Sequence, residues 1–134
     1  MSESTRALIL KHWALANARQ WDEFARLLSP VVRYEVPQTR EYIDSKGGYL
    51  EMFKTWPGDW RATVKSLICE EAQAVSIIEF TIESESEAGT ESEVMTGISV
   101  FHIENGLISQ VTDYWPEPYE PPPRATSAFK RRAQ

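Results

Sequence analysis

Asp113 and Tyr34 carry the side chains of this sequence that are best suited to acid–base chemistry. Asp113 lies in DYWPEP, where an alternating stretch ends at two prolines, and Tyr34 lies in VVRYEVPQ. A carboxyl group among aromatic rings loses hydration, which raises its pKa and makes it a better base near neutral pH. A phenol beside it can orient water or donate to a developing oxyanion. In the alternative interpretation, Asp113 only ends a strand and bonds to Tyr34 or to the backbone.

If these two residues line a pocket, its wall would be apolar, because large apolar side chains share their predicted face or lie on the helices that cover it. Such a pocket would suit a hydrophobic small molecule that carries a carbonyl group. We expect its substrate-binding wall to consist of Trp13, Val36, Phe53, Phe80, Phe101, Val111 and Trp115.

His102 is a rival base whose position depends on one turn. A two-residue turn at Asn105 and Gly106 would place His102 on the same face as Asp113, whereas a three-residue ENG loop would separate them. We predict the three-residue loop, with His102 on the outer face. His12, on the first helix, is predicted at the edge of that helix rather than in a catalytic role.

The composition argues against several classes of partner. The chain has 14 basic and 20 acidic residues and a net charge of −6, which disfavours binding to nucleic acid. The basic cluster 130–132 is interpreted as a solvated tail. Cys69 has no internal disulfide partner and is predicted to be a small core residue. With no glycine-rich phosphate loop and no metal-ligand spacing, the sequence implies no cofactor and no metal.

The targeting signals are also absent from the sequence pattern. No stretch approaches the roughly 18 apolar residues of a membrane span. The first ten residues, MSESTRALIL, lack the basic start and the cleavage site of a secretory signal. We therefore expect a soluble cytoplasmic protein that does not bind a membrane.

The elements that must position these residues follow from the hydrophobic periods. Helical spacing predicts two opening helices, at about 4–17 and 21–28. A strand follows at about 29–37, then a third helix at about 46–55, capped by Asp44 or Ser45. Strands are predicted at about 60–70, 75–85, 93–103 and 107–115. The order α-α-β-α-β-β-β-β predicts an α+β fold with helices on one face of a mostly antiparallel sheet.

The domain organisation is expected to be simple. With 134 residues, the chain fits one domain over residues 1–118. Residues 119–134 form a proline-rich C-terminal strap and polar tail, stiff enough to cross the domain or a partner subunit.

The second face of the sheet is predicted to be apolar as well. Ile98 and Val100 alternate with the inner residues of their strand, and Ile77 is expected beside them. A monomer rarely exposes such a patch, so we predict a homodimer through this open face. The alternative is a few scattered surface aliphatic residues.

The element order, VVRYEVPQ, VFHIENGLISQVTDYW and the proline-rich exit together resemble the SnoaL-like branch of the nuclear transport factor 2-like superfamily. The resemblance covers residues from about 6 to 118 and implies a cone, in which a curved sheet wraps around a pocket. Members of the superfamily include ketosteroid isomerases, polyketide cyclases, limonene epoxide hydrolases, scytalone dehydratase and catalytically silent domains, so the fold does not fix the function.

The resemblance transfers only part of any known catalytic set. The pattern of the limonene epoxide hydrolases places one aspartate at Asp113 and a tyrosine at Tyr34, but their asparagine falls on Val36. Their arginine and second aspartate fall on Phe80 and Ile82, so that mechanism is not expected. The ketosteroid isomerase base would fall on Val36, directly before a proline, and is missing too.

Three functional hypotheses follow. The first is a cofactor-independent isomerase, cyclase, dehydratase or hydrolase with Asp113 as acid or base and Tyr34 as its partner. The second is a small-molecule binding module without turnover. The third is a dimerising structural domain whose interior is filled by Trp13, Phe53 and Trp115. The sequence leaves open whether the protein is an enzyme.

Overall fold

The computed structural model describes residues 2–133, and within them it contains three helices and six strands. The helices are α1 (Ser2–Asn17), α2 (Trp21–Ala25) and α3 (Lys46–Thr55). The strands are β1 (Leu28–Val36), β2 (Glu41–Ile43), β3 (Asp59–Cys69), β4 (Gln73–Ser86), β5 (Gly89–Glu104) and β6 (Leu107–Tyr114). Among the described residues, no helix is long and apolar enough to cross a membrane.

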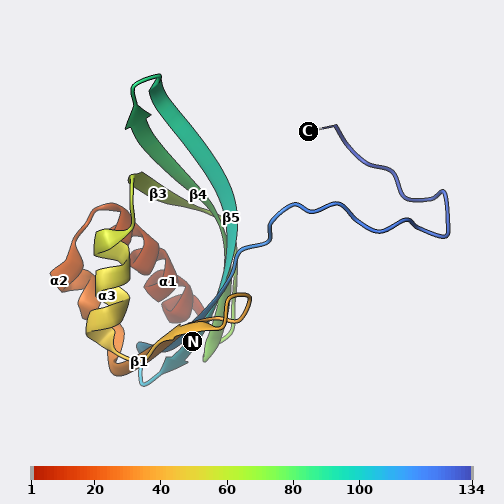
Figure 1. Cartoon of the computed structure of the whole chain (residues 1–134). Helices are drawn as coiled ribbons and strands as arrows, with labels where there is room; N and C mark the ends of the chain where they lie inside the picture. The colour runs from red at the N-terminus through yellow and green to blue at the C-terminus, as the bar shows by residue number, and fades with distance from the viewer. Residues whose placement is uncertain (1, 134) are drawn as a thin grey trace.

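The sheet has the order β2-β1-β6-β5-β4-β3 and is curved but not closed. Strands β1 and β6 run parallel, and the other neighbours are antiparallel. Figure 1 shows the three helices on one side of this sheet. The predicted α+β cone is therefore confirmed, as is the order of the elements, apart from one added strand.

Helix α1 buries one stripe against the sheet. Thr5, Ile9, His12 and Ala16 recur at helical spacing and are all buried. The prediction that His12 lies at the helix edge is wrong, because this side chain is 0% exposed and lies in the middle of the stripe. Its ring packs against Trp13, at a centroid distance of 4.5 Å.

Helix α3 begins where the sequence places its cap. The Ser45 hydroxyl accepts a hydrogen bond from the backbone N–H of Gly48 at 3.0 Å, which satisfies one of the free donors of the first turn. The helix then presents Tyr49 and Phe53 to the core. This packing compensates for the low helix propensity of its two glycines.

Strand β2 was not predicted. It has three residues, too few for an alternating pattern, and follows a tight turn in which Arg40 adopts a positive φ of 64°. It pairs antiparallel with the end of β1, with Tyr34 opposite Ile43. The chain segment after Pro37 therefore folds back along β1 instead of leaving the sheet.

The turn between β5 and β6 differs from the predicted three-residue loop. Asn105 and Gly106 have φ values of 53° and 77°, and Glu104 pairs directly with Leu107, as in a two-residue hairpin turn. A bulge then shifts the register between the His102 and Ile103 pairs, which moves the later residues of β6 to the opposite face. The predicted separation of His102 from Asp113 is thus confirmed, but the bulge rather than the loop produces it.

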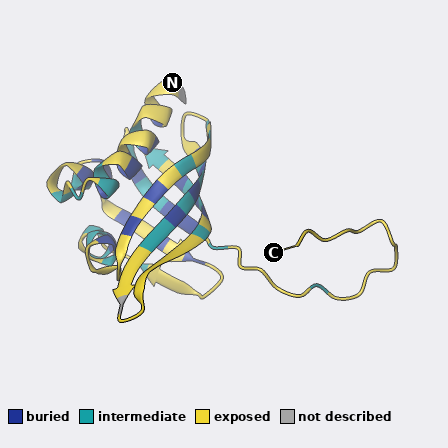
Figure 2. Ribbon diagram, turned by 90° about the horizontal axis from the view of Figure 1, so that it is seen from above, coloured by how far each residue is buried: buried dark blue, intermediate teal, exposed yellow. Residues whose placement is uncertain are grey.

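Two segments project from the body of the domain. The acidic hairpin that joins β4 to β5 extends past the end of β3, as Figure 1 shows, and its tip is exposed. Residues 116–133 run away from the domain and are exposed along almost their whole length (Figure 2). Within this tail, Arg131 and Glu120 form an ion pair at 2.7 Å. The predicted strap does not cross the cone of its own chain.

Candidate active site

The carboxyl group of Asp113 is buried and held by two hydroxyl groups. Tyr34 donates its hydroxyl hydrogen to Oδ2 of Asp113 at 2.6 Å, and Ser99 donates to Oδ1 at 2.6 Å. The Asp113 residue is only 6% exposed. Each carboxyl oxygen accepts two hydrogen bonds when ionised, so each retains capacity for a ligand or a water molecule.

Three neighbouring strands bring these residues together. Ser99 on β5 lies directly opposite Asp113 on β6 in the antiparallel register. Tyr34 on β1 pairs with Val111, two residues before Asp113, in the parallel register. Because residues two apart on a strand share a face, Tyr34 and Asp113 point to the same concave side.

Burial changes the acidity of both members of the pair. Loss of hydration raises the pKa of Asp113 from 3.8 to about 6, although the hydrogen bonds from Ser99 and Tyr34 partly oppose this. Burial also raises the pKa of the Tyr34 phenol, and the negative charge of Asp113 and their mutual hydrogen bond raise it further. Tyr34 is therefore a neutral hydrogen-bond donor at physiological pH, whereas the pKa of Asp113, about 6, lies close to that pH.

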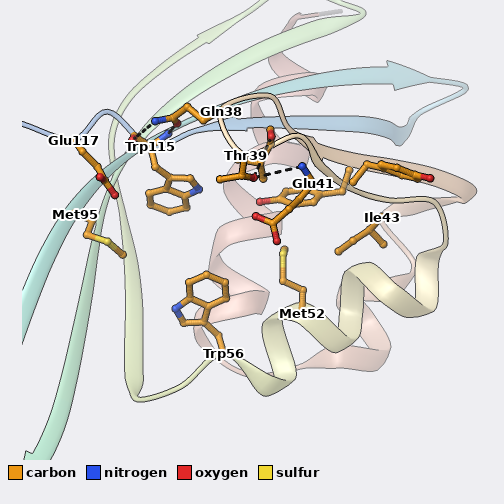
Figure 3. Close-up of a pocket in the computed structure, with 12 residues that line it drawn as sticks. Gln38, Thr39, Glu41, Ile43, Met52, Trp56, Met95, Trp115 and Glu117 are labelled. Carbon is orange, nitrogen blue, oxygen red and sulfur yellow. Dashed lines mark hydrogen bonds between the residues drawn. The ribbon is translucent and has the colours of Figure 1, made fainter.

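Two adjacent spaces lie beside the pair. An outer cavity of about 400 Å³ opens between β2, α3 and the end of β6 (Figure 3). An inner chamber of about 30 Å³ contains Asp113 in its wall. Both spaces are lined by Tyr34, Met52, Trp56 and Trp115, so they adjoin at these four side chains. The chamber has room for a water molecule or the tip of a ligand.

Most of the predicted wall residues reach these spaces. Trp13, Phe53 and Phe80 line the inner chamber, Val36 lines the outer cavity, and Trp115 lines both. Phe101 and Val111 do not line either space: they are 0% and 1% exposed and belong to the core beneath it. Their placement in the wall was wrong, because sharing a face with Asp113 puts a residue on the concave side but not at the opening.

Several residues of the site were not predicted. Pairing β5 with β6 would have identified Ser99 as the partner of Asp113, but only if the bulge in their register had been known. Gln38 holds the backbone of Trp115, accepting from its N–H at 2.7 Å and donating to its carbonyl at 2.9 Å. These two bonds hold the Trp115 backbone, from which the indole reaches both spaces. Other unpredicted lining residues are Thr39, Glu41, Tyr42, Ile43, Met52, Trp56, Met95 and Glu117.

The two histidines do not join the site. His102 is exposed on the outer face. The His12 Nε2 lies 2.9 Å from the Tyr49 hydroxyl, and burial lowers the His12 pKa to about 3, so its ring is neutral at physiological pH. Among the described residues there is no cluster of three or more His, Cys, Asp or Glu side chains that could hold a metal ion.

Comparisons with known proteins agree with this architecture. The SnoaL-like domain family model matches residues 9–111, a region that includes Tyr34 and ends just before Asp113. The solved structure of a candidate ketosteroid isomerase from Kribbella flavida is 38% identical, with a TM-score of 0.85, over 99% of this chain and 93% of its own. No curated protein matches the chain.

More distant structures share the fold alone. A candidate SnoaL-like polyketide cyclase from Shewanella putrefaciens has 7% identity and a TM-score of 0.71, over 86% of this chain and 90% of its own. An LEH-like epoxide hydrolase of M. tuberculosis has 11% identity and a TM-score of 0.70, over 86% and 84%. Since the family model covers most of the chain, the chain belongs to the SnoaL-like domain family of the nuclear transport factor 2-like superfamily.

Proposed function

We propose that this protein is an acid–base enzyme that moves a proton on a small hydrophobic molecule carrying a carbonyl group, with Asp113 as the acid or base. The observation that carries this proposal is a buried carboxyl group, with its pKa raised to about 6, in the wall of a chamber that leads to a larger apolar cavity. Perturbed carboxyl groups in clefts are candidates for this role.

The chemistry starts with Asp113 ionised. Asp113 lines the chamber, where the carbon next to a substrate carbonyl would enter. When Asp113 takes a proton from that carbon, its carboxyl group becomes neutral and accepts the hydrogen bond from Tyr34 less strongly. The Tyr34 hydroxyl, kept neutral by its raised pKa, then donates to the enolate oxygen that develops on the substrate. Return of the proton from Asp113 to another carbon completes an isomerisation.

The most similar of these solved structures supports the same class of reaction. The Kribbella flavida protein, which is 38% identical, is named as a candidate ketosteroid isomerase. The described chain has Val36 directly before Pro37. If the reaction is an isomerisation, its base is therefore Asp113 on the last strand and not a residue at the end of β1.

A second candidate function is binding without turnover. It is favoured by the observation that both oxygens of Asp113 already accept short hydrogen bonds, from Ser99 and Tyr34. A carboxyl group held in this way can serve as a fixed acceptor for a ligand hydroxyl or amine.

Proton exchange on model ketones separates these two functions. Hydrophobic ketones would be incubated with the protein in heavy water, and loss of the proton signal beside the carbonyl would be followed by NMR. We expect exchange with the wild type, with a rate that rises as pH passes through about 6, where Asp113 ionises. Asp113→Asn should abolish exchange but retain ligand binding.

Glu104→Gln, which removes an exposed carboxylate at the β5–β6 turn, serves as the matched control. This variant should exchange the ketone proton at the wild-type rate. Equal exchange rates in Asp113→Asn and the wild type would contradict the assignment of Asp113. Saturable binding of the ketones with no exchange in any variant would favour the binding module.

A further inference from the structure

The outer cavity has an aromatic wall. Tyr34, Tyr42, Trp56 and Trp115 line it, together with Met52 and Met95. In Figure 3 the indoles of Trp56 and Trp115 lie on opposite sides of the opening. Both indoles contact Phe80 edge-on, at centroid distances of 6.4 and 5.6 Å, which fixes them at the inner end of the cavity.

The charged groups of this wall are all negative. Glu41 and Glu117 line the cavity, and no lysine or arginine does. Figure 3 shows the Glu41 carboxylate directed into the space above Met52. Among the described residues, neither carboxylate has an ion-pair or side-chain hydrogen-bond partner. The negative charge of Glu41 also contributes to the raised pKa of Tyr34, in agreement with its position beside the pair.

The aromatic faces of the cavity are likewise not occupied by a cation of the protein. Elsewhere, the guanidinium of Arg19 lies 3.8 Å from the ring centroid of Trp60, so that indole is already covered. The other such contact in the described chain joins Arg124 and Phe129 in the tail. Within the described chain, no cation of the protein therefore covers Trp56 or Trp115, and both indoles line the cavity.

We propose that the outer cavity binds an organic cation, a protonated or quaternary amine attached to an apolar body. Aromatic faces attract such a cation through their quadrupole, and the attraction grows when the cation loses water. Glu41 and Glu117, which line the same cavity, would balance its charge. Carboxylate or phosphate ligands would be repelled by the same two groups, and an uncharged ligand would leave the carboxylates without a counter-charge.

This proposal narrows the substrate class of the proposed function. It rests on that function in one respect, namely that the substrate enters the same cavity. The ammonium group would lie between Trp56 and Trp115 beside Glu41, and the apolar body would extend toward the chamber and Asp113. A volume of about 400 Å³ is sufficient for a trimethylammonium group attached to one aromatic ring.

A pair of isosteric ligands tests the charge alone. We would titrate the purified protein with para-(hydroxymethyl)phenyltrimethylammonium and with para-tert-butylbenzyl alcohol, which differ only in nitrogen or carbon at the trimethyl centre. Calorimetry and tryptophan fluorescence would report binding. We expect the cation to bind about tenfold more tightly. Equal or tighter binding of the uncharged compound, or no binding of the cation, would overturn the proposal.

Two variants separate the contributions of the wall. Trp56→Leu keeps an apolar side chain but removes the aromatic quadrupole. It should therefore weaken binding of the cation about fivefold to tenfold and binding of the uncharged compound much less. Glu41→Gln should weaken binding of the cation by about twofold to threefold, because an exposed charge contributes little to binding. Glu104→Gln is the matched control and should bind both ligands as the wild type does. Circular dichroism would confirm that each variant is folded.

The ligand titration and the proton-exchange assay together distinguish failure of this proposal from failure of the proposed function. Cation binding that persists in Asp113→Asn, in a protein that exchanges no ketone proton, would support the cation site and contradict the enzyme. Proton exchange on uncharged ketones with no preference for cations would support the enzyme and contradict the cation site.

Discussion

Ser99 and Asp113 face each other across the β5–β6 pair, and the Ser99 hydroxyl donates to Oδ1 of Asp113 at 2.6 Å. Ser99 itself is 1% exposed, so the bond lies entirely inside the domain. A hydrogen bond to a buried carboxylate stabilises its charged form and lowers its pKa. Ser99 therefore limits how far burial raises the pKa of Asp113.

The first prediction concerns Ser99→Ala. Loss of the donor should raise the pKa of Asp113 further and lower the free energy of unfolding at neutral pH by about 1–3 kcal/mol, because a buried charge loses a partner. The destabilisation should shrink as Asp113 becomes protonated. Urea unfolding at several pH values would measure both effects. Ser109→Ala is the control, because it removes a half-buried hydroxyl on the same hairpin that donates to the uncharged carbonyl of His102 at 3.0 Å. An equal loss in both variants would contradict the prediction.

The second prediction concerns the pH dependence of stability. The pKa of Asp113 is raised from 3.8 to about 6 on folding. Between these values the folded protein binds more protons than the unfolded chain, so its free energy of unfolding should fall as pH rises through this window and level off above it. The contribution is at most about 3 kcal/mol.

Asp113→Asn should remove this contribution, since the amide does not titrate. The difference in unfolding free energy between the wild type and Asp113→Asn should therefore change across the same window, as measured by urea unfolding. A difference that stays constant from acidic to neutral pH would show that Asp113 keeps an ordinary pKa.

The third prediction concerns Gly97, which allows Trp115 to lie close to the sheet. A Cβ atom at Gly97 would lie 2.8 Å from Cζ3 of Trp115, so Gly97→Ala should push the indole toward the cavity. We expect a loss of about 1–3 kcal/mol in stability and weaker ligand binding. Thermal unfolding and ligand titration would measure the two effects.

Gly47→Ala is the matched control for that experiment. No atom lies within 4 Å of a Cβ at Gly47, and alanine is the better helix former in α3, so stability should rise slightly with unchanged binding. Unaltered ligand affinity in Gly97→Ala would contradict the role of Gly97 in positioning Trp115.

The fourth prediction concerns the outer face of the sheet, which we propose pairs with a second copy of the chain. Val75 lies opposite Val100 and Ile77 opposite Ile98, and all four are only half-buried in the single chain. Contiguous apolar faces of this kind are typical of interfaces. Sedimentation velocity should show a dimer for the wild type and a monomer for Ile98→Glu.

Ala7→Glu, on the exposed side of α1, introduces the same charge away from this face and should remain dimeric. A monomeric wild type would contradict the proposal. So would a dimer that Ile98→Glu leaves intact.

The sequence predicted the helices and long strands well, for physical reasons that individual residues illustrate. Ile9 and Ala16 recur at helical spacing and are buried as expected, and Tyr34 and Val36 alternate inward on β1. These patterns are local, so they can be detected without tertiary information. The pairing of Tyr34 with Asp113 came instead from the resemblance to the limonene epoxide hydrolases, whose pattern places an aspartate and a tyrosine at these two positions.

The missed features depend on tertiary geometry. Strand β2 is too short for a pattern and is a strand only because β1 lies beside it. Ser99 became a partner of Asp113 through a bulge that alternation does not reveal. Alternation also could not distinguish Phe101 and Val111, which fill the core, from Phe80, which reaches the chamber, because all three lie on the concave face.

The parallel pairing of β1 with β6 has a consequence for biosynthesis. Tyr34 and Asp113 are separated by 79 positions, and the strand that carries Asp113 is the last one in the chain. Contacts between distant residues form slowly and only after the intervening chain is available. While the ribosome is still making β6, β1 has only the three-residue β2 as a neighbour. The hydrogen bond between Tyr34 and Asp113 therefore cannot form before β6 has been synthesised.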